Sequence, residues 1–377
     1  RYTIRFVLMQ PVAVFPYLLA SSFNFVVPKA VVLKEGDLYF ASHPIGTGPY
    51  MLQSWQKGVR VVVVRNPHYY HTGKPYIDKI IADISVAPNI IALKVEKGDL
   101  DGFGIATEVA ASDLQQARND PRFSRYLVSG PTAWVTWLDV NVHAAPLNSP
   151  ALRQAIALAI DHNRLVQLLG GQAFPAHQLF FPIDPQYDPM LEQHPVYGYD
   201  PAKAAALVKA SGYHGQLITI LYPSDYGFHV STAPGVEQDL RQIGLNVTLR
   251  GVTATSLGAI QASLTGHQIS FNQWSPDYAD GYDYYQGEIS CGVSAAGGES
   301  GAHDCIPAAD ALVAKAEGLP LGPERDALLR QADVIALRRA SRIPLVFLKV
   351  TDMVSPRVGG YYWHSVFGWQ PENYWLK

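Results

Sequence analysis

The run Gly46-Thr47-Gly48-Pro49-Tyr50 is followed by Arg65-Asn66-Pro67-His68-Tyr69-Tyr70 and then by Gly73-Lys74-Pro75-Tyr76-Ile77-Asp78-Lys79. Glycines and prolines here bound short strand-like runs, which predicts a tight turn, a hairpin and a rigid loop. Between and after these runs the pattern is rich in β-forming residues, at 50–52, 59–64 and 80–84. The sequence therefore predicts a small sheet in this region.

Composition limits the classes of function that this chain can have. Its 377 residues can form two or three domains with a sizeable core. The formal net charge of -3 provides no basic field for nucleic acid, so no nucleic-acid partner is expected. The longest apolar run, residues 59–64, is interrupted by Arg60 and is far shorter than a membrane span.

Alternation of strand and helix patterns predicts an α/β architecture with a partly parallel sheet. Residues 1–8 alternate like a strand rather than a signal peptide, and residues 14–27 resemble a buried apolar segment. Residues 286–304 are expected to form a loop rich in glycine and serine. The remaining expected strands are 134–141, 217–222, 245–252 and 268–271, and the expected helices are 89–97, 110–117, 152–160, 161–169, 202–210, 235–243 and two within 308–339.

The chain has two cysteines, Cys291 and Cys305, which flank the expected loop. Two thiols on either side of a flexible loop, with none elsewhere, fit one disulfide in an exported protein, and a pair of free thiols is the alternative. Closing a loop of about 15 residues would contribute about 3 kcal/mol of stability. The absence of a CxxC pattern argues against a cysteine-based zinc site.

The opening run closely resembles the signature of the extracytoplasmic solute-binding proteins of ABC importers, family 5, which includes peptide- and nickel-binding members. Four further blocks resemble that family and occur in its order. They are Leu138-Asp139-Val140-Asn141, Arg153-Gln154-Ala155-Ile156, Tyr199-Asp200-Pro201-Ala202-Lys203-Ala204 and Trp274-Ser275-Pro276-Asp277-Tyr278-Ala279-Asp280. Ile343-Pro344-Leu345 lies where the family's last strand returns. The resemblance covers the chain almost from end to end.

The resemblance implies a two-lobed periplasmic-binding-protein-like α/β fold (type II, cluster C) whose first lobe is incomplete. Residues 1–40 would be the tail of an inserted small domain, 41–142 the middle segment of lobe I, 143–352 lobe II and 353–377 the return to lobe I. The family signature stands early, so we expect that the first strands of lobe I are not in this chain. A fragment, a cleaved product and a naturally short relative are the open explanations, and a separate N-terminal fragment is a potential partner.

The family resemblance also implies the function. The protein would capture a small ligand, foremost a peptide, between two lobes and deliver it to an ABC permease in the membrane, in the periplasm or another extracytoplasmic compartment. A lipid anchor on a missing N-terminus is an open alternative. Hinges are expected near residues 139–146 and 350–356. Metal chelates, glycosides, opines and haem are the alternative ligands, and a sensory or regulatory ligand-binding domain is the alternative role.

No catalytic or cofactor motif is present in the sequence. The chain contains neither G-x-S-x-G nor H-E-x-x-H, and it has no phosphate-binding glycine loop, so we expect no enzyme activity and no cofactor. Arg153 is expected to tie its helix to a neighbour through an ion pair rather than to act in catalysis. No metal site is expected at His68 and His71, which a solvated loop explains, and His162, His177 and His194 look scattered and incidental.

The candidate ligand-binding residues follow the expected strand at 268–271. By resemblance to peptide-binding members, Asp277 would bind the α-amine of a peptide and Trp274 would form an apolar wall. The alternative is that Asp277 only caps the following turn. Tyr278, Tyr282, Tyr284 and Tyr285 crowd the same segment, and one or two of them are expected to face the ligand, foremost Tyr278 and Tyr282.

Overall fold

The computed structural model of the chain describes every residue except 1–2, 85, 87, 103–110, 296–297 and 299. The chain forms two compact units, and each is described here by itself. Unit 1 contains residues 1–18 and 131–349, and unit 2 contains residues 19–130 and 350–377. Among the described residues, we find no helix whose length and hydropathy would let it cross a bilayer.

The opening run of the sequence forms part of a three-stranded antiparallel sheet in unit 2, as predicted. Strand β1 (Tyr50–Gln56) pairs with β2 (Arg60–Arg65), which pairs with β3 (Lys79–Asp83). Gly58, in the β1–β2 turn, has a φ of 72°, a conformation that glycine adopts without steric cost. Asn66 closes the preceding turn by donating its side-chain N–H to the carbonyl oxygen of Gly48 at 2.8 Å.

The rigid loop of unit 2 is held by the end of the chain. The hydroxyl of Tyr69 donates to the Glu372 carboxylate at 2.7 Å, and the Lys74 ammonium donates to the side-chain oxygen of Asn373. The other elements of unit 2 are α2 (Lys29–Glu35), α3 (Asp37–Ser42), α4 (Pro88–Lys97), α5 (Ala111–Asn119), α6 (Pro121–Ser124), η1 (Ser22–Asn24), η4 (Pro371–Asn373), β10 (Val358–Gly359), β11 (Trp363–His364), β12 (Gly368–Trp369) and β13 (Trp375–Leu376).

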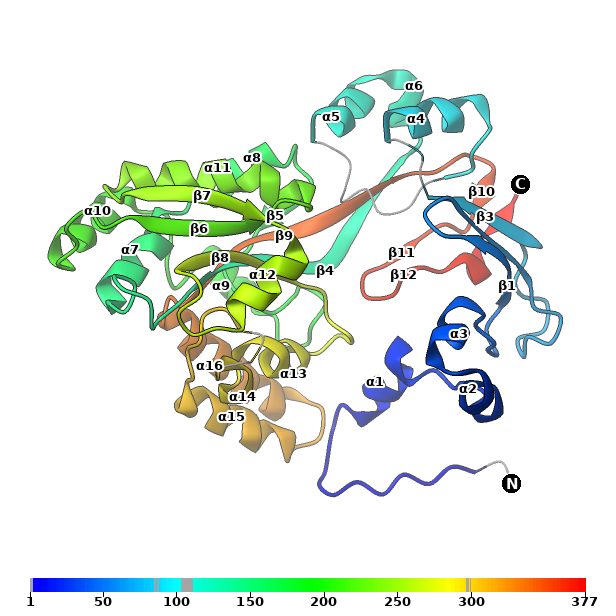
Figure 1. Ribbon diagram of the computed structural model, residues 1–377, viewed down its shortest axis with the longest axis horizontal. Coiled ribbons are helices and arrows are strands. Elements are labelled where there is room, and N and C mark those ends of the chain that lie inside the picture. The colour runs from blue at the N-terminus through cyan, green and yellow to red at the C-terminus, as the bar shows by residue number, and fades with distance from the viewer. Residues whose placement is uncertain (1–2, 85, 87, 103–110, 296–297, 299) are drawn as a thin grey trace. The chain divides into compact units, whose positions relative to one another are not determined.

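A six-stranded mixed sheet, in the order β5-β9-β4-β8-β6-β7, is the centre of unit 1 (Figure 1). Strand β6 runs parallel to both β7 and β8, while β4 is antiparallel to β8 and β5 is antiparallel to β9. The prediction of a partly parallel α/β sheet is therefore confirmed. The strands are β4 (Leu127–Val140), β5 (Ala173–Pro175), β6 (Ile218–Pro223), β7 (Val247–Val252), β8 (Ile269–Trp274) and β9 (Arg342–Met353).

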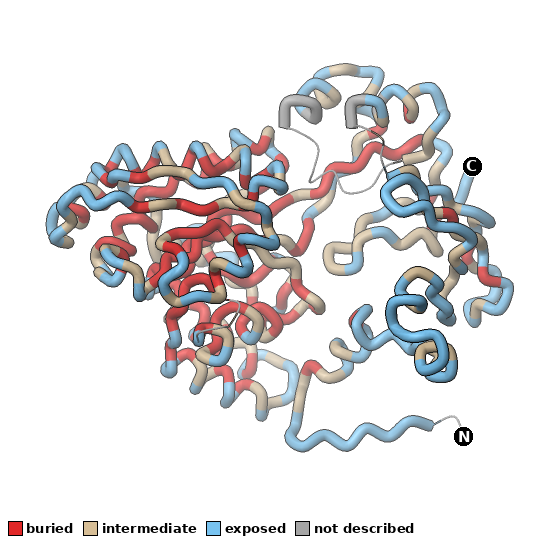
Figure 2. Tube along the Cα trace, viewed as in Figure 1, coloured by how far each residue is buried: buried red, intermediate tan, exposed pale blue. Residues whose placement is uncertain are grey.

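The core of unit 1 lies between this sheet and the helices that pack on it. It joins Leu138 and Val140 of β4 and Phe271 of β8 to buried side chains such as Ile156 of α7 and Leu240 of α11. Figure 2 shows this region as the most continuously buried part of the chain. The helices of unit 1 are α7 (Pro150–Ala159), α8 (His162–Leu168), α9 (Pro189–Gln193), α10 (Pro201–Ala210), α11 (Gly227–Gln242), α12 (Ala254–Gln261), α13 (Gly281–Tyr284), α14 (Cys291–Ser294), α15 (Pro307–Glu317) and α16 (Pro323–Arg338), with a π-helix η3 at Tyr285–Ile289.

The prediction for the beginning of the chain is wrong. Residues 3–8 are exposed and outside any strand, because alternation does not form a strand without a partner to pair with. Residues 14–27 are not a buried apolar segment either. They form α1 (Phe15–Ala20) and η1, with Val14 2% exposed but Phe23 78% and Phe25 69% exposed.

Three other elements differ from the expected ones. Helix α11 begins at Gly227 rather than at Gly235, because it continues through Pro234. Proline lacks a backbone N–H and usually marks a helix boundary, which explains the error. Strand β4 begins earlier than predicted, at Leu127. The expected loop at 286–304 contains η3 and α14, although three of its residues lie outside the described part of the chain.

Strands β4 and β9 each belong to both units. The chain passes from unit 2 to unit 1 between Gly130 and Pro131 and back between Lys349 and Val350. The expected hinge at 139–146 lies within unit 1, where Val140 is fully buried, and it remains a prediction. The hinge at 350–356 and the predicted domain limits remain predictions.

Candidate functional site

The candidate site is the segment that follows β8 in unit 1, residues 274–283. The carboxylate of Asp277 is partly exposed, and it accepts no hydrogen bond and forms no ion pair within the part of the chain that the structure describes. The following turn is capped by Asp280 instead, whose carboxylate accepts the backbone N–H of Tyr282 at 3.0 Å. The alternative interpretation of Asp277 as a helix cap is therefore wrong, and its carboxylate is available.

A second carboxylate, that of Asp283, holds two of the predicted site residues in place. Its Oδ2 atom accepts the backbone N–H of Asp277 at 2.8 Å and the indole N–H of Trp274 at 3.4 Å. Asp283 is only 8% exposed. Burial raises the pKa of the Asp283 carboxyl to about 6, and the negative charge of Asp277 adds to the shift.

A buried ion pair supports the segment from α16. The Arg325 guanidinium binds the Asp280 carboxylate in a two-point arrangement, with N–O distances of 2.7 and 2.8 Å, and both side chains are almost fully buried. Gln186 donates to the same carboxylate at 3.2 Å and accepts the backbone N–H of Gly281 at 2.8 Å. Because the Asp280 carboxylate accepts hydrogen bonds from Arg325, Gln186 and the backbone of Tyr282, the turn between Asp280 and Gly281 is fixed.

The electrostatic balance of the segment favours a cation. The Asp280 carboxylate is neutralised by Arg325, and burial raises the pKa of Asp184 well above its usual range, which disfavours a negative charge there. Burial also raises the pKa of Asp277. Near neutral pH, the carboxylates of Asp277 and Asp283 are thus left without a cationic partner among the described residues.

The indole ring of Trp274 is packed against the π-helix η3. A Cβ atom on Gly287 would lie 3.1 Å from the edge of that ring, so glycine at this position allows the close approach. The indole is thus held on its N–H side by Asp283 and on its six-membered ring by Gly287. This fixed, partly exposed ring is suited to forming one wall of a ligand site.

The four tyrosines of the segment have different environments. Tyr278 is 6% exposed, and its ring lies 6.1 Å from that of Tyr17. The hydroxyl of Tyr282 donates to the Glu317 carboxylate of α15. Tyr284 and Tyr285 are fully buried, with Tyr284 packed edge-on against Trp137 at 5.3 Å. Tyr284 and Tyr285 therefore belong to the core. Tyr282 is partly exposed and Tyr278 keeps a small exposed fraction, so among the described tyrosines of the segment these two are the candidates for ligand contact.

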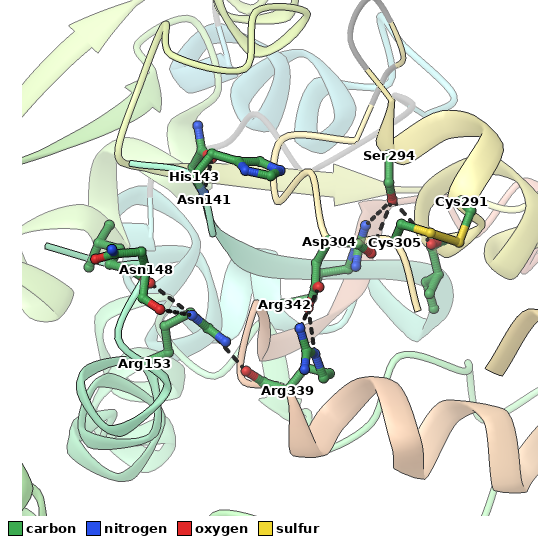
Figure 3. Close-up of polar contacts among 12 residues, drawn as sticks. Asn141, His143, Asn148, Arg153, Cys291, Ser294, Asp304, Cys305, Arg339 and Arg342 are labelled. Carbon is green, nitrogen blue, oxygen red and sulfur yellow. Dashed lines mark hydrogen bonds and ion pairs between the residues drawn. A yellow bond between two sulfur atoms is a disulfide. The ribbon is translucent and has the colours of Figure 1, made fainter. Parts of the chain in front are cut away.

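The predicted disulfide between Cys291 and Cys305 is present and closes the segment that follows η3. Figure 3 shows the contacts on either side of it. Asp304, next to Cys305, binds the Arg339 guanidinium at 2.9 and 3.0 Å, and Ser294 accepts a hydrogen bond from the buried Arg342 at 3.2 Å. The disulfide is therefore flanked by polar contacts to the last turn of α16 and the start of β9.

Arg153 is buried, as a structural residue would be, but within the described part of the chain it does not form the predicted ion pair. Its guanidinium donates to the carbonyl oxygens of Leu147 at 2.9 Å, of Asn148 at 3.3 Å and of Arg339 at 3.2 Å (Figure 3). Arg153 thus ties the start of α7 to the end of α16 through backbone acceptors rather than through a carboxylate.

The histidines differ from expectation in one respect. His68 and His71 lie on the exposed loop of unit 2, but His162 and His177 are not scattered, since their rings are in contact, tilted by 39° with centroids 4.4 Å apart. The carboxylate of Glu192 lies 2.9 Å from Nδ1 of His177, and burial lowers the pKa of His162 to about 4. Across the described residues, no group of three or more potential ligands is placed to hold a metal ion.

Three residues that organise the site were missed by the sequence analysis. Asp283 stands six residues after Asp277, in a run of tyrosines that drew attention to the rings instead. Arg325 and Gln186 lie 45 and 94 residues from Asp280 along the chain, so no local pattern could have joined them to it.

The sequence of the whole chain is similar to those of known bacterial binding proteins. The di/tripeptide-binding protein 2 of Pseudomonas aeruginosa is 27% identical over 372 residues, which cover 96% of this chain and 67% of that protein. The probable D,D-dipeptide-binding periplasmic protein DdpA of Escherichia coli is 30% identical over 290 residues, covering 74% of this chain and 54% of that protein. The chain thus spans between half and about two thirds of the length of these relatives.

A solved structure supports the same relation at the level of the fold. The periplasmic binding protein DppA from Helicobacter pylori, in complex with the peptide STSA, superposes with a TM-score of 0.83 at 24% identity, over 98% of this chain and 72% of that chain. Residues 1–295 match the bacterial extracellular solute-binding proteins, family 5 (middle). The match covers well over half of the chain and agrees with the α/β fold and with the five blocks of sequence. The chain belongs to the family 5 bacterial extracellular solute-binding proteins.

Proposed function

We propose that this protein binds a short peptide through its free α-amine and delivers it to an ABC permease. The observation that carries the proposal is the carboxylate of Asp277, which has no partner among the described residues, in a turn whose backbone shares one Asp283 oxygen with the indole N–H of Trp274. A carboxylate in a partly desolvated site binds an ammonium group more strongly than it would in water. The peptides bound by related proteins support this choice of ligand class.

Tyr278 and Tyr282 complete the proposed site. Their positions, next to Asp277 and next to Asp283, place two aromatic rings on the same segment as the carboxylate. Aromatic rings present apolar area together with a polar tip, which suits the side chain and backbone of a peptide. The nearby cationic side chain, Arg325, is already bound to Asp280, so the segment itself offers an amine site rather than a carboxylate site.

Binding of a free amine can be tested by titration calorimetry. The probes are the dipeptide L-alanyl-L-phenylalanine, the dipeptide D-alanyl-D-alanine, and L-alanyl-L-alanyl-L-alanine, each with its N-acetylated form. We expect at least one free-amine peptide to bind and its N-acetylated form to bind at least about tenfold more weakly, because acetylation removes the charge.

Substitution of the anchor residue provides the second arm of this test. Asp277→Asn should weaken the binding of the same peptide by at least about tenfold, while the matched substitution Asp225→Asn, at an exposed carboxylate after β6, should leave it unchanged. Equal binding of the free and acetylated peptides, or no effect of Asp277→Asn, would refute the amine site. Failure of all three peptides to bind would refute the peptide class and direct attention to non-peptide ligands.

The rest of the functional assignment follows from the same proposal. The protein acts by non-covalent capture and not as an enzyme, it works outside the cytoplasm, and its macromolecular partner is the membrane permease. A separate N-terminal piece and a lipid anchor are further components that this role accommodates. Turnover of a bound peptide, detected by mass spectrometry after incubation, would contradict the binding-only role.

A further inference from the structure

We propose that Asp283 is a positioning residue for ligand capture. Its carboxylate fixes Asp277, the proposed anchor for the amine, relative to Trp274, the proposed aromatic wall of the site. This inference rests on the proposed function, because it concerns the same Asp277 and Trp274. It extends that function to a residue that would touch the ligand only through others.

The geometry of the Asp283 carboxylate carries the inference. One of its oxygen atoms, Oδ2, accepts both the backbone N–H of Asp277 and the indole N–H of Trp274. The two donors come from different places, since Trp274 is the last residue of β8 and Asp277 lies in the turn beyond it. A single acceptor shared by both fixes the distance between the anchor and the wall.

The position of Asp283 in the fold makes this contact rigid. Asp283 lies in α13, whose start is capped by Asp280, and Asp280 is held by the buried Arg325 of α16. Beyond α13, Gly287 in η3 packs against the ring of Trp274. The indole is therefore bounded by two consecutive helical segments, and Asp283 connects it to the turn that carries Asp277.

Loss of this carboxylate would act on the ligand indirectly. Without an acceptor, the backbone N–H of Asp277 and the indole N–H of Trp274 would both have to find water, and the turn would lose the contact that orients the anchor. A displacement of about 1 Å in a binding group is enough to reduce its contribution substantially. The geometry also predicts that asparagine can replace Asp283, because its side-chain oxygen accepts the same two hydrogen bonds.

The test compares four variants by calorimetry with the free-amine peptide that the unsubstituted protein binds best among the three named above. Asp283→Ala should weaken binding by about tenfold, whereas Asp283→Asn should weaken it by less than about threefold. In a protein that already carries Asp277→Ala, Asp283→Ala should cost clearly less, at most about threefold, because the anchor carboxylate is gone and only the position of Trp274 is still affected. Equal losses in both backgrounds, or no rescue by asparagine, would overturn the inference.

A matched control separates positioning from general destabilisation. Asp200 accepts the backbone N–H of Lys203 at 2.9 Å as the cap of α10, in the same unit but away from the segment. Asp200→Ala removes a hydrogen bond of the same kind and should lower the melting temperature without changing the affinity for the peptide. A loss of affinity in this control would show that affinity follows stability, and would overturn the positioning role.

A ligand-free measurement distinguishes failure of this inference from failure of the proposed function. In the ¹⁵N-labelled protein, the indole N–H of Trp274, assigned among the seven tryptophans with Trp274→Phe, should exchange with solvent faster in Asp283→Ala and at nearly the original rate in Asp283→Asn. Absence of peptide binding would overturn the proposed function alone. An unchanged exchange rate in Asp283→Ala would overturn the positioning role, whatever the ligand.

Discussion

The buried ion pair between Arg325 and Asp280 provides a sharp test of how the candidate site is held together. Both side chains are at most 2% exposed, and the two N–O distances are 2.7 and 2.8 Å. Arg325→Met removes the cation but leaves the carboxylate buried. Breaking a buried pair in this way costs about 3–5 kcal/mol, because the remaining charge is uncompensated. The equilibrium constant for unfolding should therefore rise roughly 10²- to 10⁴-fold.

The measurement is urea unfolding of the purified protein, followed by tryptophan fluorescence. Arg330→Met, at a partly exposed arginine of the same helix, is the control and should change the free energy of unfolding by less than about 0.5 kcal/mol. The double variant Arg325→Met/Asp280→Asn should recover most of the loss, since asparagine is neutral and can still cap α13. The reasoning is refuted if Arg325→Met resembles the control, or if the double variant is no more stable than Arg325→Met alone.

Two further predictions concern stability. Burial raises the pKa of Asp333, on α16, to about 8. The folded protein therefore keeps a proton on this carboxyl that the unfolded chain loses near pH 4. The free energy of unfolding should fall as the pH rises between these two values, by on the order of 5 kcal/mol. Asp333→Asn should flatten that part of the pH profile of the melting temperature, whereas the control Asp99→Asn, at an exposed site, should not. An unchanged slope in Asp333→Asn would contradict the raised pKa of Asp333. Replacing both Cys291 and Cys305 by serine should lower the free energy of unfolding by about 3 kcal/mol in urea titrations. A dithiol reductant should destabilise the unsubstituted protein but leave the double variant unaffected, and equal responses would argue against the cross-link as the cause.

Local signals in the sequence predicted much of the fold. Asp161 and Asp200 stand where helices begin, and the structure shows each accepting a backbone N–H as a cap. Gly48, Pro49 and Pro67 marked the limits of the hairpin of unit 2 in the same way. These predictions succeeded because a cap or a turn depends on residues that are neighbours in sequence.

The errors and omissions have the opposite origin. Residues 3–8 have the pattern of a strand but lack a partner in the described structure, and pairing is a property of two segments. The residues that organise the candidate site also act over long separations, as Arg325 does on Asp280. Trp274 and Asp277 could be named from the family resemblance, whereas the carboxylate that joins them had to be seen in three dimensions.

The division of the chain has a consequence for the order in which the protein can fold during synthesis. Unit 1 is nearly continuous, but unit 2 needs residues 350–377, which are synthesised after unit 1, to complete it. Val354 donates its backbone N–H to the carbonyl oxygen of Tyr126 at 2.7 Å, and the hydroxyls of Ser129 and Thr351 are 2.7 Å apart. Residues 19–130 of unit 2, including the first residues of β4, therefore lack their partners from residues 350–377 while unit 1 is being synthesised. That interval is when the nascent chain is most exposed to aggregation, and it sets a demand for chaperones that the stability of the finished protein would not reveal.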